Sequence, residues 1–263
     1  MAYQRAASYR DYEKYAFASY KLAWCWYNVG EYGKAIDTMK TVVDYSTKMA
    51  QASPGSKSNI QLQDEALKDL VRFFADAGDL DEAYEYFNKL GKPELVRDML
   101  KRLASTYFEQ GKFEQAIQTY RRLITEKPDA PQAPEYQNEI IQCLTKMGKK
   151  EDTIAEIDRL RTQYGKNSSW ARANASNTES IKTASEFIEK NLRTVATNYQ
   201  IEGNKLTGEA QKRVRSLAEG AYATYLDEYP DSKYSYDMRY AYGELLYKLK
   251  KFDGAYEQYM KVV

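Results

Sequence analysis

The side chains that most often carry out catalysis are scarce in this sequence. It contains no histidine and only two cysteines among 263 residues. The lack of histidine excludes Ser-His-Asp and Cys-His nucleophiles, zinc–histidine sites and histidine-ligated haem. Two cysteines are too few for a disulfide framework or a cysteine-rich metal site. No phosphate loop of the form GxxxxGK followed by Ser or Thr occurs, and no GxGxxG motif. We therefore predict no catalytic residue, no metal site and no cofactor, and we expect the chain not to be an enzyme.

Adjacent carboxylates are groups that could do acid–base chemistry. The pairs Asp81–Glu82 and Glu151–Asp152 precede apolar positions at helical spacing. A carboxylate in the first turn of a helix is stabilised by the helix dipole. We interpret these pairs as helix-opening residues.

Charge and hydropathy limit the kinds of partner. The chain carries 39 basic and 38 acidic residues, so its net charge is +1 and no overall field attracts nucleic acid or an anionic membrane. The mean hydropathy is −0.75, and no apolar run approaches the ~18 residues of a membrane-spanning helix. The first residues also lack the apolar region of a signal peptide. We expect protein partners, no nucleic-acid partner and no membrane insertion by this segment.

A repeated pattern predicts the elements that position any binding side chains. The pattern contains small residues at fixed spacing, a turn glycine and aromatic residues, as expected where two antiparallel helices pack closely. Further copies are centred on Gly30, Gly78, Gly148 and Lys250, the last with lysine in place of the turn glycine. The best copy contains Leu103, Ala104, Tyr107, Gly111, Phe113, Ala116, Tyr120, Leu123 and Pro128.

The spacing of these copies predicts one continuous array over residues 1–263. Ser53–Ser56 is expected to be a surface loop, and the polar segment after Tyr164 is expected to precede a long helix of about six turns. Cys25 and Cys143 are expected to be small buried residues, three repeats apart and too distant for a disulfide. The predicted repeats are 15–48, 64–96, 97–130, 134–165, an elongated pair at 178–229, and 233–263.

The residues of this pattern resemble the tetratricopeptide repeat (TPR) family from about Tyr15 to Val263. The resemblance implies an all-α fold, a right-handed TPR-type helical solenoid of antiparallel helix pairs. It also implies a non-catalytic scaffold or adaptor that binds a partner peptide or helix in its concave groove.

Two segments are similar to repeats of bacterial cell-envelope proteins. The segment YLDEYPDSKYSYDMRYAYGELLYKLKKFDGAYEQYMKVV resembles repeats of outer-membrane-assembly lipoproteins and of the Tol-system periplasmic coordinator. The segment YKLAWCWYNVGEYGKAI is similar to large envelope repeats of gliding and predatory bacteria. The resemblance implies a periplasmic or envelope location. Two alternatives remain open: a cytoplasmic adaptor or co-chaperone, and the binding arm of a larger enzyme whose catalytic domain lies outside these residues.

The family's ligand-facing positions can be placed on this sequence by register. They give a groove with an aromatic end and a partly basic middle, suited to an apolar side chain or helix with an acidic group nearby. The alternative is that Phe17, Tyr20 and Trp24 are covered by a preceding helix. The candidate residues are Phe17, Tyr20, Trp24, Tyr27 and Asn28, then Lys68, Arg72 and Asp76, then Lys101, Ser105, Phe108 and Glu109.

This groove departs from that of chaperone-binding members of the family. Trp24, Arg72 and Ser105 occupy the position where those members carry an asparagine that clamps a terminal carboxylate. A receptor for chaperone tails is therefore not expected.

Both ends of the sequence look cut, so we expect a fragment of a longer protein or self-association through exposed terminal repeats.

Overall fold

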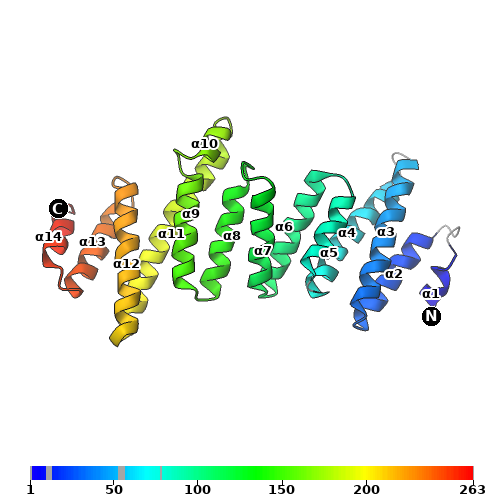
Figure 1. Ribbon diagram of the computed structural model, residues 1–263, viewed down its shortest axis with the longest axis horizontal. Coiled ribbons are helices and arrows are strands. Elements are labelled where there is room, and N and C mark those ends of the chain that lie inside the picture. Colours follow the sequence, from blue (N-terminus) through cyan, green and yellow to red (C-terminus); the bar gives the residue numbers. More distant parts are fainter. Residues whose placement is uncertain (1, 10–13, 53–56, 78, 263) are drawn as a thin grey trace. The chain divides into compact units, whose positions relative to one another are not determined.

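The computed structural model describes residues 2–9, 14–52, 57–77 and 79–262, and every regular element among them is an α-helix (Figure 1). The chain divides into two compact units, Met1–Leu123 and Ile124–Val263. The loop predicted at Ser53–Ser56 and the turn glycine Gly78 lie outside the described residues. The prediction of an all-α fold built from antiparallel helix pairs is confirmed.

The described residues of the first unit form seven helices, the last of which runs three residues past the unit boundary. From α1 to α6 successive helices pack against one another, and α4 also packs against α6. Phe108 of α6 meets Phe113 of α7. The bounds are α1 Ala2–Ala6, α2 Tyr15–Asn28, α3 Tyr32–Ala52, α4 Lys57–Ala77, α5 Leu80–Lys89, α6 Pro93–Glu109 and α7 Phe113–Glu126.

The core of the first unit follows the repeat pattern. The alanines predicted at close-approach sites, among them Ala23, Ala83 and Ala104, are completely buried. Aromatic rings fill the space that they leave; Phe74 and Phe87, for example, meet edge to face with their centroids 5.7 Å apart. The small residues let helix axes approach, and the rings restore packing density.

The second unit contains the remaining helices, with α11 and α12 as its longest antiparallel pair (Figure 1). At 28 residues α11 is longer than the six turns expected from its apolar positions. The bounds are α8 Ala133–Lys146, α9 Lys150–Tyr164, α10 Ser169–Ala173, α11 Thr178–Lys205, α12 Gly208–Glu228, α13 Ser235–Lys248 and α14 Phe252–Met260.

The polar segment after Tyr164 does more than separate two helices. It forms the short helix α10, which begins at the N-cap Ser168 and buries Trp170 in the core of the second unit. The indole Nε1 of Trp170 donates a hydrogen bond of 2.8 Å to the carbonyl of Ala130. The single tryptophan among polar residues was the signal for this anchor, since a buried indole needs an acceptor.

The turns between paired helices use the left-handed backbone conformation. Gly30, Gly111 and Gly148 have φ values of +80°, +73° and +70°. Lys250 has φ +61° at the turn where the sequence places lysine in place of glycine. None of the described helices is long and apolar enough to cross a membrane.

Candidate functional site

The aromatic residues predicted from α2 meet two carboxylates of α4 in the first unit. The Tyr20 hydroxyl donates a hydrogen bond of 2.5 Å to Oδ2 of Asp69, and Nε1 of Trp24 donates one of 2.9 Å to the same oxygen. One turn further along α2, the Tyr27 hydroxyl donates to Asp76. Asp69 and Asp76 are seven residues apart, so both lie on the side of α4 that faces α2.

Asp76 also connects this cluster to α6. Its Oδ1 accepts a hydrogen bond of 2.8 Å from Nε2 of Gln110, the C-cap residue that follows α6. The Tyr27 hydroxyl in turn accepts a hydrogen bond of 3.2 Å from Nε of Arg72. Side chains from α2 and α4 and the end of α6 are thus joined in one hydrogen-bonded network.

Arg72 lies over the aromatic part of the network. Its guanidinium carbon is 5.6 Å from the centroid of the Trp24 ring and 5.5 Å from that of Tyr27. Both rings rest on the buried Phe73, which stacks on Tyr27 at 4.5 Å and meets Trp24 edge to face at 5.2 Å. Arg72 is exposed, and no carboxylate of the described residues forms an ion pair with it.

The hydroxyls in the network are hydrogen-bond donors at neutral pH. Burial, followed by the hydrogen bond to Asp69, raises the pKa of Tyr20 to about 12. Burial and the hydrogen bond to Asp76 raise the pKa of Tyr27 as well. A phenol beside a carboxylate holds its proton because its ionised form would be repelled.

The network thus joins five of the predicted residues: Tyr20, Trp24, Tyr27, Arg72 and Asp76. On the same helices, Phe17 is 50% exposed, so the alternative that a preceding helix covers it does not hold for this side chain. Asn28 and Lys68 are exposed as well. We name Tyr20, Trp24, Tyr27, Arg72, Asp69 and Asp76 the α2–α4 cluster.

The predicted residues of α6 lie apart from the cluster's hydrogen bonds. Oγ of Ser105 is 3.3 Å from the Tyr120 hydroxyl, and the Phe108 ring meets Phe113 of α7 edge to face at 5.5 Å. Both contacts join the two helices of one pair. Lys101 and Glu109 are exposed.

Asp69 was not among the sequence candidates. The signal for it was the series Asp69, Arg72 and Asp76, whose spacing of three and four residues puts all three on one face of a helix.

The expectation that both cysteines are buried is wrong for one of them, because Cys143 is buried and Cys25 is exposed. The inward positions of α2 are taken by residues such as Ser19 and Ala23, and Cys25 falls outside them.

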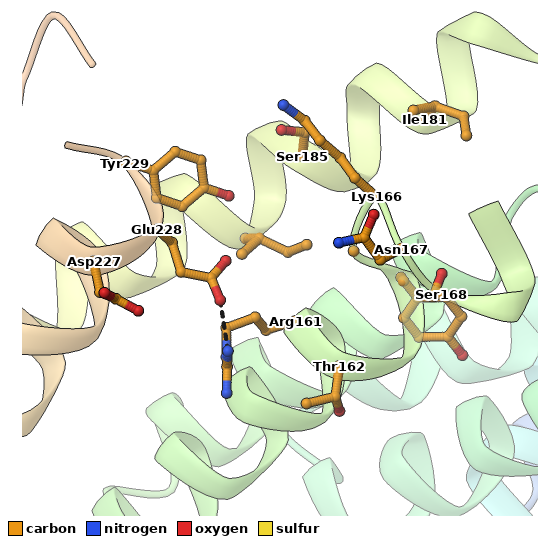
Figure 2. A pocket seen from close by; sticks show the side chains of 13 residues that line it. Arg161, Thr162, Lys166, Asn167, Ser168, Ile181, Ser185, Asp227, Glu228 and Tyr229 are labelled. Carbon is orange, nitrogen blue, oxygen red and sulfur yellow. Dashed lines mark hydrogen bonds and ion pairs between the residues drawn. The ribbon is translucent and has the colours of Figure 1, made fainter. Parts of the chain in front are cut away.

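A pocket of about 580 Å³ in the second unit was not predicted from the sequence (Figure 2). It lies where α9 and α12 end beside α11. Arg161 donates hydrogen bonds of 2.6 Å to Asp158 and 2.5 Å to Glu228, the latter drawn in Figure 2. Two carboxylates therefore pair with this guanidinium, whereas Arg72 has no carboxylate partner among the described residues. Among the described residues, no cluster of His, Cys, Asp or Glu could hold a metal ion.

Comparison with known proteins supports the repeat resemblance over part of the chain. The family model described as tetratricopeptide repeat matches residues 74–138, about a quarter of the sequence. Repeats of this family are typically non-catalytic. No protein of curated function matches the sequence. The similarity to envelope proteins in particular remains a prediction.

Two solved structures are similar over most of the chain but with low scores. A tetratricopeptide repeat protein from Parabacteroides merdae is 15% identical, covers 99% of this chain and 78% of its own, and has a TM-score of 0.30. A Rap protein complexed with competence and sporulation factor is 14% identical, covers 99% of this chain and 67% of its own, and has a TM-score of 0.36. Scores this low place no residue of the α2–α4 cluster, and no function is carried over from these proteins.

Proposed function

We propose that the chain is a non-enzymatic protein-interaction scaffold whose first unit binds a partner peptide or helix on the α2–α4 cluster. Arg72 is the observation that carries this proposal. Its guanidinium lies over Trp24 and Tyr27, is exposed, and has no carboxylate partner among the described residues. The guanidinium of Arg72 can therefore form an ion pair with an anionic group of a partner.

The partner that suits this surface carries an acidic side chain next to a large apolar one. The acidic group would pair with Arg72, and the apolar group would contact the rings and the exposed Phe17. Asp69 and Asp76 already hold the rings in place through their hydrogen bonds. Because these side chains are ordered before binding, little conformational entropy is lost when a partner docks.

A peptide selection tests this proposal even though the natural partner is unidentified. A phage-displayed library of random peptides is selected on the purified chain, and the affinity of enriched peptides is measured by fluorescence anisotropy. We expect enrichment of Asp or Glu beside Leu, Phe or Trp. The Arg72→Ala variant should bind these peptides at least ~10-fold more weakly, the effect of losing a central interface residue.

Lys89→Ala is the matched control, because Lys89 is an exposed cation on α5 outside the α2–α4 cluster. It should leave the affinities unchanged. Failure to enrich any peptide, or equal binding by the Arg72→Ala variant, would rule out this surface as the binding site.

We also propose that the scaffold acts in the bacterial cell envelope, on the side of the periplasm. The support is the similarity of Tyr20–Ile36 and Tyr225–Val263 to envelope repeats. Fractionation of the source cells, with an antibody against the chain, tests this location. Recovery from the cytoplasmic fraction alone would favour the cytoplasmic adaptor or co-chaperone.

A further inference from the structure

The helix pair α13 and α14, drawn in orange and red in Figure 1, exposes many large apolar side chains. Six of them are each between 53 and 65% exposed. Single exposed apolar residues are ordinary on protein surfaces, but contiguous patches of several hundred Å² mark interaction sites. We name these six residues the aromatic face: Tyr236, Tyr240, Tyr247, Phe252, Tyr256 and Met260.

The six side chains lie in two rows, one on each helix. Their spacing is four and seven residues on α13 and four and four on α14, which places each set on one side of its helix. One ring contact joins the two sets, since Tyr247 meets Phe252 at 5.5 Å. Tyr240 also meets the half-buried Tyr259 of α14 at 6.1 Å. The patch is therefore not a scatter of isolated residues.

One carboxylate beside this surface accepts a hydrogen bond. The Tyr259 hydroxyl donates a hydrogen bond of 2.6 Å to Oε1 of Glu244, which lies on α13. The other polar atoms of the face are tyrosine hydroxyls, each of which can both donate and accept a hydrogen bond. Such a surface is complementary to itself, because aromatic rings pair with rings and hydroxyls with hydroxyls.

We propose that a second copy of this chain covers the aromatic face, forming a dimer in which the same face is used by both copies. Aromatic side chains bury ~150 to 250 Å² each, so six residues exposed by more than half offer roughly 500 to 900 Å² per copy. A stable interface needs about 800 Å² per partner. A two-fold symmetric pair uses one self-complementary patch twice, which suits this surface. The dimer involves the second unit alone and does not depend on the proposed peptide site.

Sedimentation equilibrium over a range of concentrations tests this dimer. We expect the mass to rise from the 30.5 kDa of one chain toward twice that value. The variant Tyr236→Lys with Tyr256→Lys puts four charges into the interface of a dimer. These two side chains make no ring contact within the described part of the chain, so the fold should be kept, as circular dichroism would verify. The dissociation constant should rise at least ~100-fold.

Tyr9→Lys is the control, since Tyr9 is 61% exposed but lies in the first unit. It should dimerise as the unaltered chain does. An independent measurement is hydrogen exchange, where the amides of α14 should exchange more slowly as concentration rises. A chain that stays monomeric at every concentration overturns the proposal, and so does a dimer that the double variant leaves unchanged.

Discussion

At the scale of single residues, Asp69 and Asp76 of α4 accept hydrogen bonds from tyrosine and tryptophan side chains of α2. Asp69 accepts hydrogen bonds from Tyr20 and Trp24, and both of these side chains are half-buried. The register of α2 predicts the donors, because inward and outward positions follow from the repeat. The acceptor could not be predicted in the same way, since it depends on which side of α4 faces α2.

Removing this acceptor should weaken the first unit. In Asp69→Ala, two partly buried donors lose their shared acceptor, so the free energy of unfolding should fall by about 1 to 3 kcal/mol. Urea denaturation followed by tryptophan fluorescence measures the change. The control is Asp37→Ala, which removes a carboxylate that is 79% exposed and should change the stability by less than ~0.5 kcal/mol. Equal effects of the two changes would show that the Asp69 hydrogen bonds add nothing to stability.

At the scale of helices and turns, much of the structure could be predicted from the sequence. The small residues, the turn positions and the long pair of α11 and α12 all follow from spacing. Helix α10 could not be predicted, because its five residues are too short for a periodic pattern and its anchor is a tertiary hydrogen bond from Trp170 to Ala130. The hydrogen-bonded network at the end of α6 was missed for a similar reason, since Gln110 and Asp76 are 34 residues apart.

A glycine at position 250 should make the second unit more stable. A side chain in the left-handed conformation costs roughly 1 to 2 kcal/mol, and glycine relieves this at the cost of greater freedom in the unfolded chain. Lys250→Gly should therefore raise the free energy of unfolding of the second unit by about 1 kcal/mol. The control Lys248→Gly lies within α13 and should lower it by ~0.5 to 1 kcal/mol. Urea denaturation followed by circular dichroism compares the two, and a loss of stability in Lys250→Gly would contradict this account.

Close packing between α13 and α14 depends on Gly243, because glycine has no side chain. A Cβ atom there would lie 2.7 Å from Cε1 of Tyr259, whose hydroxyl is bonded to Glu244. Gly243→Gln should lower the melting temperature, because displacing the ring costs about 1 to 3 kcal/mol. At Gly220 in α12 a Cβ atom would meet nothing within 4 Å. Gly220→Gln should therefore stabilise the helix by ~0.5 to 1 kcal/mol. If the melting temperatures of both variants moved in the same direction, close packing against Tyr259 would not explain the effect of Gly243→Gln on stability.

At the scale of the whole molecule, the 25 tyrosines link stability to pH. They serve both units as packing residues, and their hydroxyls are often partly or fully buried. Burial raises the pKa of Tyr107, Tyr164 and Tyr199 to about 12 each. Tyr20 in the first unit and Tyr229 in the second have pKa values raised to about 12 as well, burial again being the largest cause.

These shifts predict a loss of stability in alkali. An unfolded tyrosine ionises at its ordinary pKa of 10.0, whereas these folded ones ionise at about 12. Between these values the folded chain binds more protons than the unfolded one, so the free energy of unfolding falls as pH rises. The stabilisation is complete below pH ~10 and is lost by pH ~12. Circular dichroism against pH, with phenolate absorbance recorded in parallel, should show helix loss and tyrosine ionisation together.

Lysines ordinarily lose their charge near pH ~10.4, so a variant must separate the two causes. Tyr164→Phe removes one buried titrating group and leaves every lysine in place. Burial is the main cause of the raised pKa of Tyr164. The variant should therefore lose less stability than the unaltered chain between pH 10 and pH 12. An identical decline in both chains would assign the alkaline transition to the lysine ion pairs, whereas a shallower decline in the variant would assign part of it to the buried phenols.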